Sequence, residues 1–255
     1  MTILIAAPIG DGKEYSINEF FDYVVNQDLS DVEIALCVNG KSDASIRKKI
    51  AMLKMVELTH KSGSKIPLNI LKLNYKESYS LNERLIYSRE SIRQYAIEFK
   101  DYFSHIYWMD TDTIPNRSQD IKVLLDAKKD FISGVYFYKA SRQPVIISLG
   151  GVNVTLEKLS EQHSKKEVFK IWGCGYGALL MSRKVFETCE FEWSVHKDDW
   201  SDDFAHCEVV EKKGFNRWCS AEVVCRHYRK EDFTVVQGSE DVETKIDQGT
   251  KNKSA

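Results

Sequence analysis

The chain has 255 residues, a usual length for one α/β domain or for two small domains that share an interface. Its 36 basic and 38 acidic side chains leave a net charge of −2, and 43% of its residues are hydrophobic. These values exclude a disordered charged chain and a protein held to nucleic acid by bulk charge, so we predict a folded protein without a nucleic-acid partner.

The first half of the chain alternates short apolar runs with segments of helical periodicity. Strands are predicted at residues 2–7, 32–38, 68–73 and 105–109. Helices are predicted at 16–27, about 43–59 and about 80–99, where apolar side chains recur at spacings of three and four. Three strand–helix units followed by a fourth strand predict an open, mostly parallel α/β sheet with helices on both faces.

The second half has a different pattern, with shorter apolar runs and more polar interruptions. Strand-like runs are predicted at residues 131–138, 144–149, 178–181 and 219–225, with a helix at 202–213. A glycine-rich loop at 172–177 precedes the third of these runs. From Gln237 onward only Val242 and Ile246 are apolar, so we predict that residues 237–255 form a disordered tail and that 1–236 form a single domain.

The predicted topology places a site at one edge of the sheet. Ligands of open α/β sheets bind beyond the carboxyl ends of the strands. Residues 8–12 follow the first strand, Asn39 follows the second, and Asp110 and Asp112 follow the fourth. We therefore expect these residues to gather at one ligand-binding edge.

Asp110-Thr111-Asp112 is the strongest local feature. Two carboxylates at positions i and i+2 offer hard oxygen ligands for a divalent cation that keeps open positions for phosphate oxygens. The alternative is chance, because an Asp-x-Asp sequence occurs in many chains of this length.

A second acidic cluster, residues 198–203, lies directly before the predicted helix at 202–213. In one interpretation these residues only begin the helix, with Ser201 as its N-cap and the acids in a first turn that the helix dipole favours. The other is that a carboxylate of the cluster is a general base aimed at the same site. His227 ends the last predicted strand between Arg226 and Arg229, where it is either structural or a contact to a metal or a diphosphate.

The segment Gly10-Asp11-Gly12-Lys13 does not match a phosphate-binding P-loop. That motif has a glycine five residues before the Gly-Lys pair and a Ser or Thr after it, whereas Glu14 follows Lys13 here.

Taken in chain order, these features resemble glycosyltransferases of the GT-A fold, of the inverting, family-2-like kind. The resemblance is carried by YWMDTD (107–112), DFISGVYF (130–137), GYGALLMSRKVF (175–186) and DDFAHC (202–207), and it extends from about Thr2 to Arg229. It implies a mostly parallel twisted sheet flanked by helices with a smaller antiparallel sheet on the acceptor side. It also implies a nucleotide-sugar-binding half at 1–115 and an acceptor half at 116–236.

The resemblance implies roles for individual residues. Asp112 would ligate a cation, either Mn²⁺ or Mg²⁺, with Asp110 near the ribose or a metal-bound water and His227 as a third contact to metal or diphosphate. Asp203 would be the base that takes the proton of the acceptor hydroxyl. Asp202 replaces the family's usual Glu, which leaves open which carboxylate of the pair is the base.

The donor side is implied in the same way. Ala7 and Pro8 would line the donor pocket, and Arg89 stands where the family often has Arg-Asn. Asn39 occupies a place where the family usually has an acidic residue, a departure that weakens the prediction of a uridine nucleotide.

The implied activity is metal-dependent transfer of a sugar from a nucleotide-diphosphate sugar to the hydroxyl of a glycan, lipid-linked or protein acceptor, with inversion by a single displacement. Two alternatives stay open: a non-catalytic nucleotide-sugar-binding domain, and a sugar-1-phosphate nucleotidyltransferase. Residues 10–14 do not match the loop expected of the latter.

The six cysteines form no Cys-x-x-Cys pair and mostly lie in apolar runs, so we predict reduced core thiols. No targeting segment is evident, and no apolar run approaches the ~20 residues of a membrane span. We therefore predict a cytoplasmic protein without a transmembrane segment.

Overall fold

A computed structural model describes residues 2–74, 76, 78–99, 102–139, 141, 143–192 and 201–228. Three features singled out above lie outside these described residues: Asp198 and Asp199 of the acidic cluster, Arg229, and the predicted tail from Gln237 to the end.

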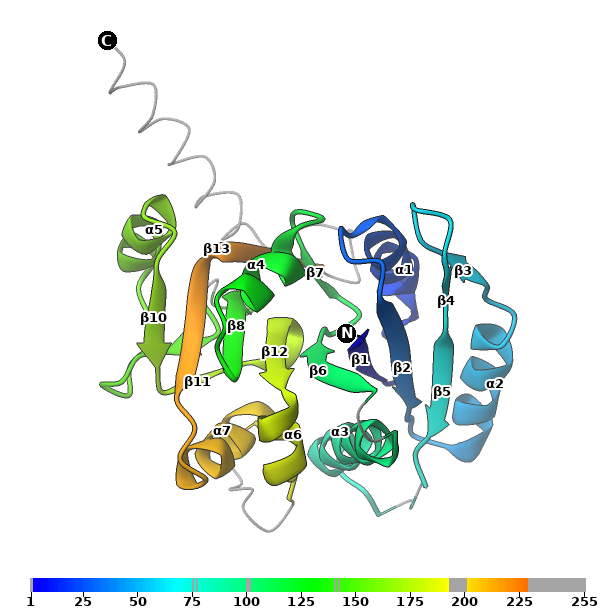
Figure 1. Cartoon of the computed structure of the whole chain (residues 1–255). Helices are drawn as coiled ribbons and strands as arrows, with labels where there is room; N and C mark the ends of the chain where they lie inside the picture. The colour runs from blue at the N-terminus through cyan, green and yellow to red at the C-terminus, as the bar shows by residue number, and fades with distance from the viewer. Residues whose placement is uncertain are drawn as a thin grey trace.

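The N-terminal half forms a parallel sheet (Figure 1). Its strands are β1 (Thr2–Ile9), β2 (Val32–Val38), β5 (Leu68–Lys72) and β6 (Phe103–Trp108), in the spatial order β5-β2-β1-β6. All eight residues of β1 are buried, as expected for a central strand with helices on both faces. Because these strands are parallel, their carboxyl ends lie at the same edge of the sheet.

The C-terminal half continues the same sheet with mixed pairing. Beyond β6 follow β12 (Leu179–Ser182), β8 (Phe131–Val135), β13 (Arg217–His227) and β10 (Val168–Ile171). β12 is antiparallel to both of its neighbours, and β13 is parallel to β8 but antiparallel to β10. The far end of β13 also pairs with β7 (Thr113–Pro115), which brings His227 opposite Thr113, one residue beyond Asp112.

Two small antiparallel sheets accompany the large one. β9 (Ile146–Ile147) pairs with β11 (Gly173–Cys174) in the C-terminal half, and β3 (Leu58–Thr59) pairs with β4 (Lys65–Ile66) beside β5. The predicted fold class, a large and mostly parallel sheet flanked by helices with a smaller antiparallel sheet, is therefore confirmed.

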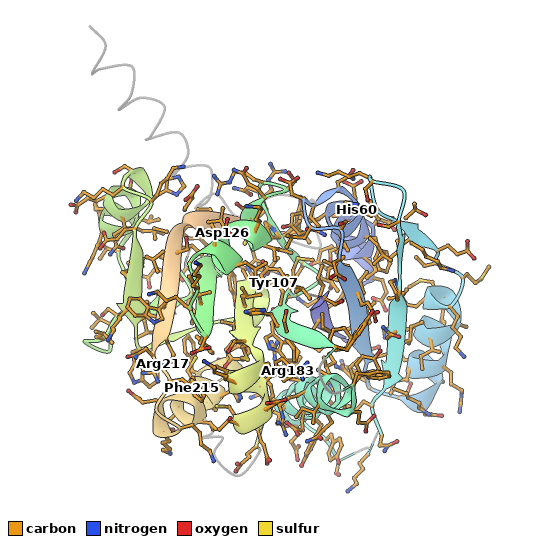
Figure 2. All side chains as sticks on the ribbon, viewed as in Figure 1. His60, Tyr107, Asp126, Arg183, Phe215 and Arg217 are labelled. Carbon is orange, nitrogen blue, oxygen red and sulfur yellow. The ribbon has the colours of Figure 1, made fainter. Side chains whose placement is uncertain are left out.

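Helices cover both faces of the sheet. On one face α1, α2 and α4 contribute buried apolar side chains to one core cluster, and on the other α3, α5, α6 and α7 contribute to a second. Figure 2 shows Tyr107 of β6 in the middle of the molecule, where it is fully buried in the first cluster. The helices are α1 (Ile17–Asn26), α2 (Asp43–Leu53), α3 (Leu81–Glu98), α4 (Asp120–Asp126), α5 (Leu156–Ser164), α6 (Arg183–Thr188) and α7 (Asp202–Lys212), with 3₁₀ turns η1 (Glu14–Ser16) and η2 (Tyr176–Ala178).

Several predicted boundaries were wrong. The helix predicted at 43–59 ends at Leu53, because residues 58–59 pair in the β3–β4 hairpin and Met55 is exposed to solvent. The strands predicted at 131–138 and 144–149 shorten to 131–135 and 146–147. Short helices α4, α5 and α6 were not predicted, since six to nine residues are too few to show a helical period.

Candidate functional site

A cavity of about 520 Å³ opens at the carboxyl ends of β1, β2 and β6. Six of the residues that the sequence singled out line it: Pro8, Asn39, Arg89, Asp110, Asp202 and Asp203. Three others do not line it. Ala7 is fully buried within β1, Asp112 contacts Lys13, which lines the cavity, and His227 faces Asp112. The structure therefore brings Pro8, Asn39 and Asp110 to one cavity at the sheet edge and leaves Ala7 outside it.

Asn39 shapes the wall of this cavity at the end of β2. Its backbone N–H donates to the Ile9 carbonyl oxygen at 3.0 Å, and its side-chain amide donates to Ser88 Oγ at 2.9 Å. A Cβ atom on Gly10 would come within 2.9 Å of Asn39 Oδ1, so the glycine makes room for the amide. Asn39 thus ties β1 and β2 to α3, and it is nearly fully buried.

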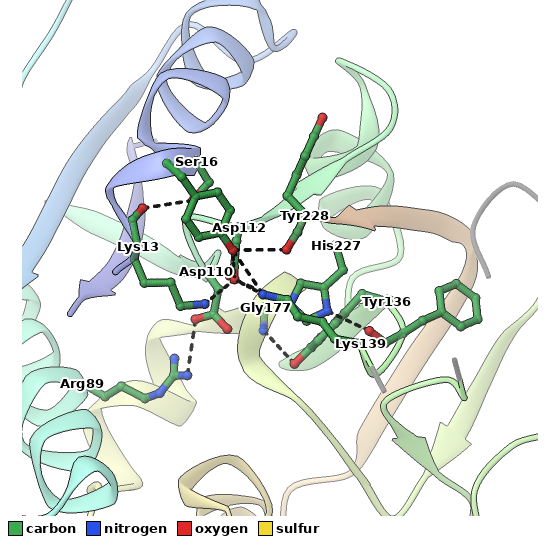
Figure 3. A network of polar contacts seen from close by, with 12 residues as sticks. Lys13, Ser16, Arg89, Asp110, Asp112, Tyr136, Lys139, Gly177, His227 and Tyr228 are labelled. Atoms are coloured by element: carbon green, nitrogen blue, oxygen red, sulfur yellow. Dashed lines mark hydrogen bonds and ion pairs between the residues drawn. The ribbon is translucent and has the colours of Figure 1, made fainter. Parts of the chain in front are cut away.

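The two carboxylates of the Asp-x-Asp segment have different surroundings (Figure 3). The Asp112 side chain is 0% exposed, and its Oδ2 accepts hydrogen bonds from Lys13 Nζ, from Lys139 Nζ at 2.6 Å and from Tyr15 Oη at 3.0 Å. Burial alone raises the pKa of Asp112, but His227, Lys13 and Lys139 outweigh it and hold the pKa well below its ordinary value. Asp110 is partly exposed and faces Arg89 instead, with Oδ1 3.6 Å from Nη2.

His227 faces Asp112 with one ring nitrogen. Its Nδ1 lies 2.7 Å from the Phe137 carbonyl oxygen, and because a carbonyl only accepts, Nδ1 carries a hydrogen. Its other ring nitrogen, Nε2, faces Asp112 Oδ2 at 3.8 Å. A backbone carbonyl that fixes the tautomer in this way is typical of histidines that bind metals.

The glycine-rich loop supports this histidine. A Cβ on Gly175 would lie only 1.8 Å from Tyr136 Oη, so the loop admits the tyrosine only because glycine stands there. The Tyr136 hydroxyl accepts from the Gly177 N–H at 3.4 Å, and its ring meets the His227 ring edge to face, with centroids 5.5 Å apart. The loop therefore positions His227 through Tyr136.

The residues around Asp112 offer few ligands to a divalent cation. Asp112 Oδ1 is buried and has no hydrogen-bond partner within the described part of the chain, which leaves an oxygen suited to a ligand. Among the described residues, no group of three or more His, Cys, Asp or Glu side chains could hold a metal ion. Asp112 and His227 thus suit a cation that shares its coordination with substrate phosphates, the usual manner of Mg²⁺ at phosphate sites, rather than one enclosed by protein ligands.

Arg89 of α3 is the centre of the opposite half of the site. Its Nε donates to Asp202 Oδ2 at 2.7 Å and its Nη2 donates to Asp203 Oδ1 at 3.1 Å. The guanidinium is buried over the rings of Trp108 and Tyr176, at 5.5 and 5.2 Å from their centroids. One cation therefore faces three carboxylates, Asp110 included.

This imbalance affects the protonation of Asp203. Burial, and then the negative charge of Asp202, raise the pKa of Asp203 well above its ordinary value, and Arg89 offsets only part of the rise. Both acids stand in the first turn of α7, where the helix dipole favours negative charge. Ser201 occupies the N-cap position, but its side chain makes no capping hydrogen bond with the described residues. The geometry therefore adds a contact to Arg89 that the helix-start interpretation alone does not require.

Sequence reasoning missed Lys13, Tyr15 and Lys139. Lys13 belongs to a segment that does not match a P-loop, so that motif gives it no role. Tyr15 and Lys13 lie in the segment after β1, which the topology already assigned to the ligand-binding edge, so the sequence held a signal for them. Lys139 comes from a loop after β8, and nothing in the sequence pattern places it beside Asp112.

Searches against protein-family models and against curated proteins found no match. Solved structures do match. A197 from STIV is 14% identical, with 90% of this chain and 86% of that chain covered and a TM-score of 0.51. GalNAc-T7 with UDP, GalNAc and Mn²⁺ is 11% identical, with 91% and 44% covered and a TM-score of 0.60. The mannosyltransferase PcManGT from Pyrobaculum calidifontis, in complex with GDP-Man and Mn²⁺, is 12% identical, with 91% and 58% covered and a TM-score of 0.53.

At these identities the likeness shows the fold, which is the GT-A fold of glycosyltransferases. The chain spans most of A197 but only about half the length of the other two proteins. Within the part of the chain that the structure describes, no helix combines the length and the apolar character needed to cross a membrane.

Proposed function

We propose that this protein is a metal-dependent glycosyltransferase that moves a sugar from a nucleotide-diphosphate sugar to an acceptor hydroxyl with inversion. The observation that carries the proposal is the division of one sheet-edge site into two halves of opposite charge. Lys13, Lys139 and His227 surround the single carboxylate of Asp112, whereas Asp110, Asp202 and Asp203 surround the single guanidinium of Arg89. A leaving diphosphate needs the first half and an acceptor hydroxyl needs the second.

The donor occupies the cavity in this proposal. Pro8 lines it at the end of β1, next in the chain to the buried Ala7, and Asn39 and Arg89 form its walls. The nucleoside diphosphate extends toward Asp112 and His227, which would hold Mn²⁺ or Mg²⁺ through the free carboxylate oxygen and the ring nitrogen. When bound, such a cation neutralises charge on the leaving diphosphate as the sugar–phosphate bond breaks. GalNAc-T7 with UDP and Mn²⁺ and the mannosyltransferase with GDP-Man and Mn²⁺ support this choice of donor and cation.

Asp203 is the proposed general base. It is the carboxylate of the pair with the raised pKa, which suits a group that must accept a proton near neutral pH. Its oxygen takes the proton of the acceptor hydroxyl while the hydroxyl oxygen bonds to the anomeric carbon and the diphosphate leaves with the electrons of the broken bond. Asp202 and Arg89 hold Asp203 in place through the shared guanidinium.

The remaining parts of the proposal concern setting and acceptor. Residues 1–115 form the donor half and 116–236 the acceptor half, and the acceptor is a glycan, a lipid-linked molecule or a protein. All six cysteines are free and buried, which supports a reducing compartment, the cytoplasm.

The test is to incubate the purified protein with UDP-, GDP- and dTDP-sugars and Mn²⁺ or Mg²⁺, and to follow release of the nucleoside diphosphate and of transferred or free sugar. We expect release with at least one donor, loss of release on complete chelation, and an inverted anomeric configuration by NMR. Binding of a nucleotide sugar without any turnover would favour a non-catalytic binding domain. Formation of a nucleotide sugar from a sugar 1-phosphate and a nucleoside triphosphate would favour a nucleotidyltransferase.

A further inference from the structure

Two lysines share one carboxylate oxygen at the site. Lys13 reaches Asp112 Oδ2 from the loop after β1, and Lys139 reaches it at 2.6 Å from the loop after β8. The two come from segments 126 positions apart in the chain, so this is not a local helix or turn contact. Two ammonium groups next to one carboxylate repel each other, which makes the arrangement easy to rearrange when another anion arrives.

The lysines and Asp112 differ in exposure. The side chains of Lys13 and Lys139 are 38% and 35% exposed, whereas Asp112 is 0% exposed. A lysine is a point charge on a flexible stem, so each ammonium can move while the carboxylate stays fixed. Lys13 also lines the cavity, which places it between Asp112 and the space that a donor would fill.

Tyr15 contacts the same carboxylate oxygen and one of the two lysines. Its hydroxyl lies 3.0 Å from Asp112 Oδ2, and Lys139 Nζ donates to that hydroxyl at 3.2 Å. The three side chains present donors to one point in space, as donors around a phosphate oxygen do. Asp112 Oδ2 therefore stands where these donors converge.

We propose that Lys13 and Lys139 are diphosphate-binding residues that neutralise Asp112 until a donor arrives. This inference rests on the proposed function and adds two residues to it. A diphosphate would take both ammonium groups and leave the whole Asp112 carboxylate to a cation. Without a diphosphate, the two ammonium groups at Oδ2 would repel a cation that binds the same carboxylate through Oδ1. The protein then binds metal and nucleoside diphosphate in concert.

The experiment measures binding rather than turnover. Binding of MnCl₂ is followed by the EPR signal of free Mn²⁺, with and without UDP, GDP or inorganic pyrophosphate, and nucleotide binding is followed by calorimetry. We expect the wild-type protein to bind Mn²⁺ at least tenfold more tightly when one of these diphosphates is present. Lys13→Met and Lys139→Met should each bind Mn²⁺ alone at least threefold more tightly than wild type, yet bind the diphosphate at least tenfold more weakly.

The matched control is Lys48→Met, because Lys48 is exposed on α2 and is not among the residues that line the cavity. It removes an equal charge, and we expect less than a twofold change in the Mn²⁺ affinity of the free protein. Circular dichroism checks that each variant folds. If a variant does not fold, the effect of a diphosphate on the Mn²⁺ affinity of the wild-type protein still tests the inference.

The outcomes separate the two proposals. If wild type binds Mn²⁺ and a diphosphate together but the affinities are independent, or the Lys13 and Lys139 variants match Lys48→Met, the inference is overturned and the proposed function stands. If wild type binds no nucleoside diphosphate under any condition, both are overturned.

Discussion

Asp110 and Asp112 are two residues apart, yet the fold gives them opposite surroundings. Asp112 is buried among Lys13, Lys139 and His227, which hold its pKa well below the ordinary value. Asp110 joins Asp202 and Asp203 around Arg89, where acids outnumber the cation and the pKa of Asp203 is well above its ordinary value. We call these the cationic half and the acidic half of the site.

The comparison shows that residue type alone does not define an acid's role. Both halves are built from aspartates and basic side chains, and the ratio between them decides whether a carboxylate stays charged. A group that must remain an anion beside phosphates belongs in the cationic half, while a group that must accept a proton belongs in the acidic half. A substitution in one half should therefore have effects that a substitution in the other half does not have.

The largest expected effect is on turnover when the acidic half loses its proton acceptor. Asp203→Asn keeps the size and polarity of the side chain but cannot take a proton, so we expect kcat to fall by about 10²–10⁴-fold. Donor affinity should change little, because the diphosphate lies in the cationic half. Steady-state kinetics and calorimetry with the best donor measure the two quantities. Near-normal kcat in this variant would contradict the assignment of the base.

Removal of the cation from the acidic half should have the next largest effect. Arg89→Met keeps an apolar stem beside Trp108 and Tyr176 but leaves buried carboxylates without their partner. Breaking a buried ion pair in this way costs about 3–5 kcal/mol, so we expect the free energy of unfolding to fall by that amount in urea titrations. The control is Lys122→Met, which breaks an exposed pair with Asp126 and should cost at most about 1 kcal/mol.

The fold was predictable where local signals agree with one another. β2 at Val32–Val38 was predicted with the correct bounds because a run that is apolar except for Glu33 ends at Asn39-Gly40. α3 begins one residue after Ser80, where Ser80 and Glu83 form a capping box that fixes the first turn. The boundaries that failed, such as the end of α2 at Leu53, depend on the β3–β4 hairpin, a pairing that no periodicity reveals.

The site was predictable to the extent that topology fixes it. Residues at strand ends, such as Asn39 and Asp110, gather because parallel strands end at one edge. The division between Asp110 and Asp112 was not predictable, since it depends on Lys139 reaching across from the loop after β8. A loop has no hydrophobic periodicity, so the sequence pattern does not reveal which site a loop side chain reaches.

The pH dependence of turnover should respond to both neighbours of Asp203. Since the base must be unprotonated, kcat/KM falls as the pH drops through its raised pKa. Asp202→Asn removes a negative charge that raises this pKa, so the acidic limb should move to lower pH. Arg89→Lys loses one of two contacts of the fork, so the limb should move to higher pH, in each case by up to about one pH unit. Profiles that move in the same direction in both variants would contradict the electrostatic account.

The smallest expected effect is on stability, where equivalent substitutions in the two halves should have opposite signs. The folded state raises the pKa of Asp203, so its ionisation costs stability once the pH exceeds the unfolded value of about 3.9. The folded state lowers the pKa of Asp112, so its ionisation contributes stability that is present above about pH 3.9 and lost as the pH falls through the folded value. A tenfold difference in proton affinity between the folded and unfolded states corresponds to about 1.4 kcal/mol.

Thermal unfolding of Asp203→Asn and Asp112→Asn from pH 4 to pH 8 measures this difference. Asparagine resembles the protonated acid, so Asp203→Asn should unfold at a higher temperature than wild type at pH 8, and Asp112→Asn at a lower one. Both differences should shrink toward pH 4, because wild-type Asp203 is then protonated and the contribution of Asp112 begins to be lost. If both variants change the unfolding temperature in the same direction at pH 8, the difference between the two halves is one of packing rather than of charge.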